Sequence, residues 1–256
     1  AGFQQLTTYS LIASFLFLIY KTLATLKKKG AQFKVGAIFF GSVTLAVLIS
    51  SIQLNSTLTL LKESSRIQIQ NPQKILNDFP FNPSNLLTLF DPFILGSANN
   101  ATYPKWNPGY WGIFWENNTY FGLLQLILIF VVAIAIIRHK KSLFNRNLLF
   151  FYFLGILGIL LALGKFGPLH PLFSIPPISF FRVPSRFLIF TFLSAAILSS
   201  AGLEFLKNRL KNRYTIFVIV SLTLTLSTFD IFRAWYRYPL TAKIKDLQET
   251  PQFIKK

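Results

Sequence analysis

The sequence contains no cysteine and no methionine, and it has two histidines and eight acidic residues against 26 lysines and arginines. Without cysteine the chain forms no disulfide, haem thiolate or zinc–thiolate site. The two histidines, His139 and His170, belong to loops that we predict on opposite faces of a membrane, so they share no metal. Walker loops, dinucleotide fingerprints, nucleophile elbows and HExxH motifs are absent from the sequence. The sequence identifies no cofactor. It does not exclude a divalent metal, but no motif supports one.

Long uncharged apolar runs dominate the rest of the chain. Six runs have roughly the 20 apolar residues that a helix needs to cross a hydrocarbon core of about 30 Å. They cover residues 6–26, 35–54, 119–137, 148–164, 187–203 and 214–232. In lipid such helices need no protein cover. We predict an all-α fold, a polytopic integral membrane bundle of six spans.

The loops between these runs alternate between strongly basic and nearly neutral. Loops 27–34, 138–147 and 207–213 hold four lysines or arginines each. The positive-inside rule puts them in the cytoplasm and leaves 55–118 and 167–186 outside. The basic loops also account for twelve of the net positive charges, +18 in all. The charge therefore indicates contact with membrane lipids, not with nucleic acid.

The predicted domains follow from the same runs. Residues 1–235 form one transmembrane domain, and residues 236–256 begin a truncated extracytoplasmic region. The chain begins Ala1-Gly2-Phe3, with neither methionine nor a signal-peptide pattern, and it stops at Lys256 without a closing element. This pattern predicts an internal piece of a longer protein.

Segment 55–118 is too long for a simple connector, and its prolines, asparagines and aromatic residues favour an ordered structure. Ser84 is suited to cap a short helix over 85–90, which would lie on the outer leaflet. Aromatic residues gather at the end of the segment, among them Tyr110, Trp111 and Tyr120. They indicate an interfacial belt or a surface that stacks on sugars, and the sequence leaves both open.

Two arginines, Arg182 and Arg186, end the proline-rich loop 167–186. Arginine suits bidentate phosphate contacts. The alternative is that both side chains snorkel to outer-leaflet head groups. Their position on the face that disfavours positive charge makes them candidates for binding a lipid phosphate.

Glu63, Asp91 and Glu116 are the candidates for catalysis among the external carboxylates. Each also has a structural explanation. Glu63 can pair with Arg66, Asp91 can cap the turn at Pro92, and Glu116 lies where a helix N-terminus favours an acid. For Asp230, an ion pair with Arg233 suffices. Small residues in 155–158 and 194–202 predict close helix packing.

The order of several short motifs resembles the bacterial YfhO-type membrane proteins, whose architecture is similar to that of GT-C glycosyltransferases. The resemblance covers about residues 35–236. The motifs, in order, are ESSR (63–66), LLTLFDPFILGS (86–97), YWG (110–112), Glu116, YFG (120–122), LALGKFGPL (161–169), FRVPSR (181–186) and GLE (202–204).

This resemblance implies a plasma-membrane protein that transfers a sugar from a polyprenyl-phosphate donor to a cell-envelope polymer on the outer face. Arg182 and Arg186 would lie near the donor phosphate, and Glu116 and Asp91 on the acceptor side. GT-C enzymes carry their catalytic acid in the first external loop. This chain lacks that loop, so the acid is expected upstream of Ala1. A lipid-linked glycan flippase and a non-enzymatic membrane scaffold are the alternatives.

Overall fold

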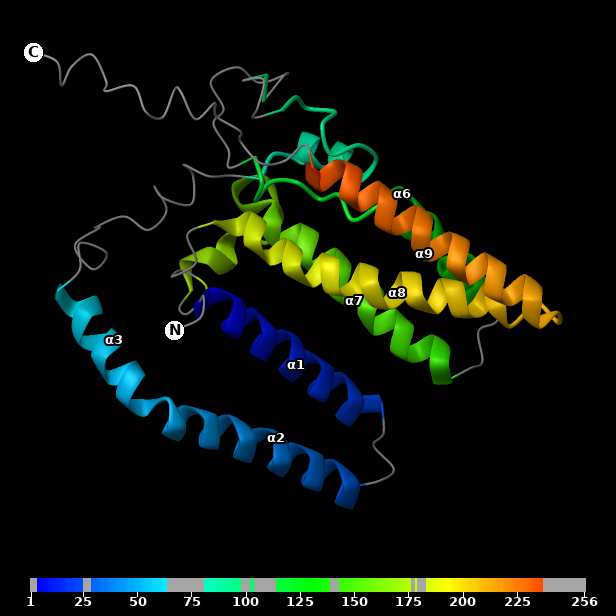
Figure 1. The fold of residues 1–256 in the computed structure, drawn as a ribbon. Coiled ribbons are helices and arrows are strands. Elements are labelled where there is room, and N and C mark those ends of the chain that lie inside the picture. The colour runs from blue at the N-terminus through cyan, green and yellow to red at the C-terminus, as the bar shows by residue number, and fades with distance from the viewer. Residues whose placement is uncertain are drawn as a thin grey trace, which may run out of the picture. The chain divides into compact units, whose positions relative to one another are not determined.

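In the computed structural model of the chain, residues 4–24, 29–63, 81–97, 102–103, 114–138, 143–175, 178 and 183–236 are described. These residues form helices and turns and no strand, which confirms the predicted all-α class (Figure 1). The α-helices are α1 (Gln4–Ala24), α2 (Lys29–Ile49), α3 (Ser51–Glu63), α6 (Leu123–Arg138), α7 (Leu143–Ala162), α8 (Leu188–Lys207) and α9 (Arg213–Tyr236). Short 3₁₀ helices are η1 (Pro83–Leu89), η2 (Gly164–Phe166), η3 (His170–Ser174) and η5 (Pro184–Phe187).

Each of the six predicted spans coincides with an apolar helix, but the helices differ in length. Three are long and apolar enough to cross a membrane: Gln5–Ala24, Pro184–Lys207 and Arg213–Tyr236. Leu123–Arg138 and Arg146–Ala162 are apolar but shorter. By length and composition the described chain has three candidate spans, or four if the bent α2–α3 pair counts as one. The number six remains a prediction.

The second predicted span, 35–54, is not one straight helix. The chain bends by 64° between Phe33–Ile49 and Ser51–Thr57. Paired small hydroxyl residues are a common cause of sharp kinks, and Ser50 and Ser51 stand at this bend. Three hydroxyls in α3 donate back to the carbonyl four residues earlier, such as Thr57 Oγ1 to Gln53 O at 2.8 Å. Such back-bonds satisfy the hydroxyls within the helix.

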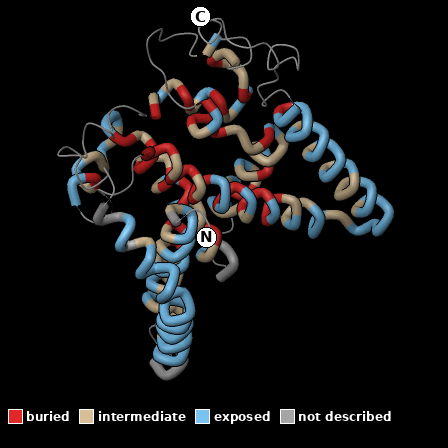
Figure 2. The backbone as a smooth tube through the Cα atoms, turned by 60° about the vertical axis from the view of Figure 1, so that its left-hand side comes forward, coloured by how far each residue is buried: buried red, intermediate tan, exposed pale blue. Residues whose placement is uncertain are grey.

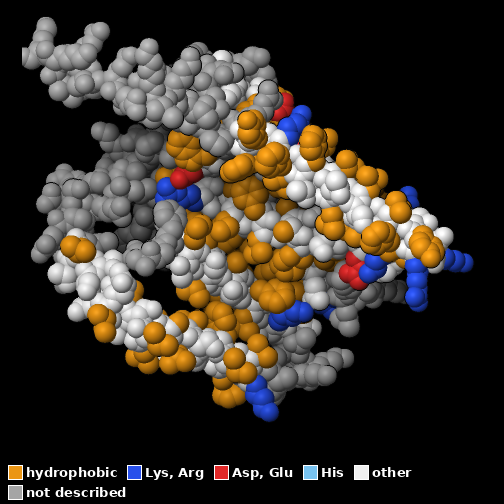
Figure 3. Space-filling model, viewed as in Figure 1, with side chains coloured by type: hydrophobic (Ala, Val, Ile, Leu, Met, Phe, Trp, Pro, Cys, Tyr) orange, Lys and Arg blue, Asp and Glu red, His pale blue; other side chains and the backbone are white. Residues whose placement is uncertain are grey.

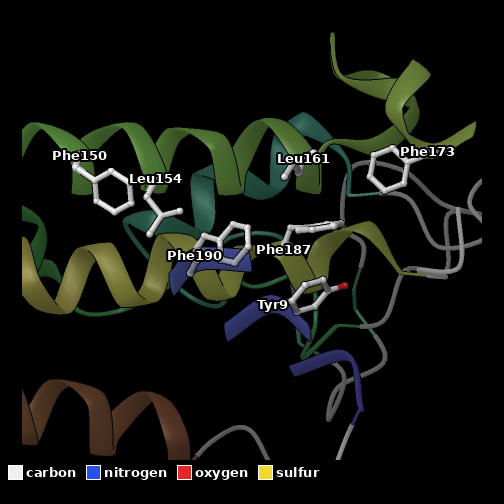
Figure 4. Close-up of a cluster of buried hydrophobic side chains, with 8 residues drawn as sticks. Tyr9, Phe150, Leu154, Leu161, Phe173, Phe187 and Phe190 are labelled. Carbon is white, nitrogen blue, oxygen red and sulfur yellow. The ribbon is translucent and has the colours of Figure 1, made fainter. Parts of the chain in front are cut away.

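The chain divides into two compact units. The first unit comprises Ala1–Pro80 and Lys141–Ser194, and the second comprises Phe81–Lys140 and Ala195–Lys256. Buried side chains from α1, α7, η3, η5 and the start of α8 form the core of the first unit (Figure 4). They are Tyr9, Ala13, Phe150, Leu154, Leu161, Phe173, Phe187 and Phe190.

Helices α7 and α8 approach closely at the predicted small residues. Thr191 Oγ1 donates to Gly155 O at 2.9 Å, across the two helices. At Gly158, an added Cβ would lie 2.9 Å from Phe187 O. In the second unit Gly202 packs on the backbone of Leu128 in α6. The prediction of close packing at 155–158 and 194–202 is therefore confirmed.

Apolar side chains cover much of the outside of the helices. Between Phe33 and Ile49 most residues of helix α2 are exposed, and Figure 2 shows exposed residues predominating along several helices. Ile38 in α2 is 69% exposed, and Phe217 in α9 is 72% exposed. In the space-filling view hydrophobic side chains lie along the outer surface of the helices (Figure 3). An apolar face of this extent is typical of contact with lipid or with another apolar partner.

Candidate functional site

The candidate phosphate-binding residue Arg186 lies in the short turn η5 at the start of α8. Its neighbours Pro184, Ser185 and Phe187 are buried, whereas Arg186 is partly exposed. The backbone N–H of Arg186 donates to Val183 O at 3.1 Å. Proline at the first position presets the backbone of this turn. Arg186 is therefore the polar side chain that an otherwise buried turn presents outward.

The turn is held by aromatic packing on one side and by a glycine on the other. The Phe187 ring lies 4.6 Å from the Tyr9 ring and 6.0 Å from the Phe173 ring, between centroids. Figure 4 shows Tyr9 of α1 beside Phe187. Gly164 has a φ of +48° and packs against the Pro184 ring. Only glycine adopts this conformation without strain while leaving room for the ring.

Helix α1 also contacts the guanidinium directly. Arg186 Nη1 donates a hydrogen bond to Gln5 Oε1. At the other end of α1, Lys21 Nζ donates to Asn147 Oδ1 of α7 at 2.8 Å. Tyr20 Oη donates to Arg146 O at 2.5 Å. Polar contacts therefore fix α1 near both of its ends.

The described parts of the predicted external loop fold around a buried polar network in the second unit. Thr88 Oγ1 lies 2.7 Å from Thr119 Oγ1 and accepts from the Thr119 backbone N–H at 2.8 Å. Asn85 is buried, and the Tyr103 hydroxyl donates to its Oδ1 at 3.4 Å. Burial raises the pKa of Tyr103, and its side-chain hydrogen bonds with Asn117 and Asn85 oppose that rise. The network ties 81–97 to the residues before α6.

Helix η1 corrects the prediction for this loop. The sequence predicts a short helix over 85–90 capped by Ser84; the structure has a short 3₁₀ helix there, Pro83–Leu89, but its cap is Asn82. Asn82 Oδ1 accepts from the Ser84 backbone N–H at 3.0 Å and from the Ser84 hydroxyl at 2.9 Å. Asparagine caps well, and Pro83 takes the first helical position, so the helix begins earlier than predicted.

The candidate acids have structural surroundings of different kinds. Asp91 is exposed, and its Oδ1 accepts from the Phe93 backbone N–H at 3.0 Å, which closes the expected turn at Pro92. Glu116 is partly exposed in the turn before α6. Glu63 is the last residue of α3, and its side chain lies outside the described part. Arg182, Tyr110 and Trp111 also lie outside the described residues.

Asp230 is a polar site in α9 that the sequence analysis explained only through Arg233. The ion pair is present, with Arg233 Nη2 3.8 Å from Asp230 Oδ1. The Tyr120 hydroxyl also donates to both carboxylate oxygens, at 2.7 and 2.6 Å, and the Leu123 backbone N–H donates at 3.2 Å. Asp230 thus caps the N-terminus of α6 from another helix. The sequence did contain a signal for such a contact: Asp230 is an acid inside an apolar run, and such an acid is as a rule functional or paired.

The described residues contain no group of three or more His, Asp or Glu side chains placed to hold a metal ion. Arg186 belongs to the first unit, whereas Asp91, Glu116 and Tyr120 belong to the second. Comparison with known proteins finds no matching family model, no matching curated protein and no matching solved structure.

Proposed function

We propose that this chain is the membrane portion of a bacterial GT-C-like glycosyltransferase of the YfhO type. It would use a polyprenyl-phosphate sugar as donor and a cell-envelope polymer as acceptor, on the outer face of the plasma membrane. Three lines of support are the apolar helices with their exposed surfaces, the basic residues in alternate loops of the sequence, and the order of the motifs. The partners would be membrane lipids and the lipid-linked sugar.

In this proposal all six apolar helices lie in the bilayer. Helix α6 and the apolar part of α7, Arg146–Ala162, are short for a span, and local thinning of the bilayer accommodates short helices at modest cost. The bend at Ser50 would let α3 leave the core and lie near the head groups. The basic loops 27–34, 138–147 and 207–213 would face the cytoplasm, and Arg186 would then lie at the outer end of α8.

The observation that carries the proposal is the partly exposed Arg186 on its buried turn. Sugar transfer breaks the bond between the anomeric carbon and the phosphate oxygen, and it forms a bond from that carbon to an acceptor hydroxyl oxygen. Negative charge grows on the departing polyprenyl phosphate while the hydroxyl proton passes to a base. A guanidinium fixed beside that phosphate stabilises the developing charge.

Arg186→Ala should weaken binding of undecaprenyl monophosphate about tenfold, because one charge-assisted contact of 1.4 kcal/mol or more is lost. Arg186→Lys should restore part of the affinity, since lysine keeps the charge but not the bidentate geometry. Binding is measured by native mass spectrometry of the detergent-solubilised protein. Arg213→Ala, at the exposed first residue of α9, is the matched control.

The same variants should be compared in cells by analysis of the envelope glycans. Loss of a glycan in Arg186→Ala but not in Arg213→Ala supports the proposal. Equal affinity of both variants, or unchanged glycans in both, would contradict it and favour a membrane scaffold.

A further inference from the structure

Trp115 is an exposed tryptophan in the turn that precedes α6. Its side chain is 58% exposed, whereas Phe114 before it and Asn117 after it are buried. Tryptophan is one of the largest apolar side chains, and folded proteins usually bury most of its surface. The turn therefore presents the indole outward while the residues on both sides face the interior.

Both ends of this turn are fixed by contacts with residues 92–93 in the same unit. The Phe114 ring lies 6.2 Å from the Phe93 ring, between centroids. The side-chain amide of Asn118 donates to Pro92 O at 2.9 Å. These contacts hold the backbone of Trp115 in place before any ligand arrives, so that binding to the indole orders little further chain.

The segment that holds the turn also carries an exposed carboxylate. Asp91 precedes Pro92, and its Oδ1 accepts from the Phe93 backbone N–H at 3.0 Å. A carboxylate has about four acceptor sites, so Asp91 can close this turn and still accept from the hydroxyls of a ligand. Hydroxyl donors to a carboxylate form strong, charge-assisted hydrogen bonds. An exposed indole and an exposed carboxylate thus lie on two segments that contact each other directly.

The charge of this part of the chain favours a neutral partner. Segment 81–122 holds Asp91 and Glu116 against Lys105, so its net charge is −1 in a chain of +18. Anionic head groups are repelled by such a segment, and residues that anchor a protein at a lipid interface include lysine and arginine beside tryptophan. A neutral sugar has C–H faces that stack on an indole and hydroxyls that donate to a carboxylate.

We propose that Trp115 and Asp91 form a binding site for a neutral glycan. The indole stacks on a pyranose ring, and the carboxylate accepts hydrogen bonds from the sugar hydroxyls. This inference rests on the proposed function, since the glycan would be the acceptor polymer of that function. It adds the chemical class of the acceptor, which is a chain of uncharged pyranose units with equatorial hydroxyls that leave a flat C–H face.

The test uses the wild-type protein in a detergent without a sugar head group, with chitotetraose as the probe and ligand-observed NMR to follow the titration. Trp115→Ala should bind chitotetraose about tenfold more weakly, because the stacking surface is lost. Trp115→Phe should restore part of the affinity. The thermal unfolding temperature should stay the same, because the indole lies mostly outside the core. Equal affinity of Trp115→Ala and the wild type would overturn the inference.

Asp91→Asn separates a binding role from a structural one. Asparagine keeps the size of the side chain and the oxygen that closes the turn, so the unfolding temperature should not change. The affinity for chitotetraose should fall about threefold, because the hydrogen bonds lose their charge assistance. Trp235→Ala, which removes another tryptophan of similar exposure (61%), is the matched control and should bind as the wild type does. Equal losses in Trp235→Ala and Trp115→Ala would overturn the assignment to this turn.

Two further ligands identify the partner and separate the two proposals. If Trp115→Ala weakens binding of phosphatidylglycerol but not of chitotetraose, the residue is a lipid anchor and the inference is overturned. If chitotetraose binding depends on Trp115 while Arg186→Ala and Arg213→Ala bind undecaprenyl monophosphate equally, the glycan site is supported and the proposed function is contradicted. If Arg186→Ala alone loses undecaprenyl monophosphate and the wild type does not bind chitotetraose, the inference alone is overturned.

Discussion

Replacing Gly158 with alanine is expected to destabilise the first unit by about 2 kcal/mol, a typical cost of overpacking a tight contact. An added Cβ would lie 2.7 Å from Thr191 Oγ1, 2.9 Å from Phe187 O and 3.0 Å from Phe190 Cβ. The carbonyl belongs to the backbone and the threonine hydroxyl is held by Gly155 O. None of these atoms moves aside cheaply, so α7 and the start of α8 must separate.

The matched control is Gly41→Ala in α2. Gly41 is also helical, and an added Cβ there meets nothing within 4 Å. Alanine favours a helix over glycine by about 1 kcal/mol, so this variant should be as stable as the wild type or slightly more stable. Both variants are compared by equilibrium unfolding in mixed micelles with increasing SDS. Equal stability of Gly158→Ala and Gly41→Ala would show that α7 and α8 are not packed as described.

Replacing Asp230 with alanine is expected to destabilise the second unit by about 3 kcal/mol, since hydrogen bonds to a charged group contribute about 1.5–3 kcal/mol each. The Tyr120 hydroxyl and the Leu123 backbone N–H would both lose their acceptor. The first N–H groups of a helix have no partner within the helix, and a negative charge at that end is favourable. The start of α6 should therefore fray first.

Two further variants rank the contacts of Asp230. Arg233→Ala should cost about 0.5 kcal/mol or less, because exposed ion pairs contribute little. Arg233 is 61% exposed and lies 3.8 Å from the carboxylate. Tyr120→Phe should fall between the two, since it removes the phenol but leaves the cap on Leu123. Hydrogen exchange at the α6 N-terminus provides the local measurement. A larger loss in Arg233→Ala than in Asp230→Ala would contradict this account.

The positions of the helices follow from apolar runs alone. The run ending at Ile137 and the run beginning near Leu148 are each uncharged, and both are helical in the structure. Backbone groups removed from water must bond to each other, and a helix satisfies them within one segment. The packing glycines were predictable for a similar reason, because small residues at regular spacing mark places where helices approach.

The bend at Ser50 could not be predicted from the apolar runs. A serine pair barely lowers the hydropathy of the run 35–54, so the run predicts a single span although the helix turns by 64°. The helix η1 shows the same limit at a smaller scale. Asn82, Pro83 and Ser84 are all suited to start a helix, and the geometry of the first turn selects Asn82 as the cap.

The hydrogen bonds between side chains of different helices could not be predicted from the sequence. Tyr120 and Asp230 are separated by 110 residues, and no local pattern pairs them. Arg186 stood out because its charge falls in a loop predicted to lie outside the membrane, but its acceptor Gln5 is an ordinary polar residue near the start of the chain. Hydrogen bonds between distant residues depend on how helices pack, and helix packing is only weakly encoded in local composition.

The amino-acid sequence by itself determined that this protein is built from apolar helices and that Arg186 belongs to a proline-rich turn between two of them. Those features depend on local hydrophobicity and backbone stereochemistry, which act over a few residues. The tertiary structure alone decided that Gln5 accepts a hydrogen bond from Arg186, that Asp230 caps α6, and that the chain bends at Ser50. These features depend on side chains brought together across long stretches of chain, where geometry selects among many chemically suitable partners.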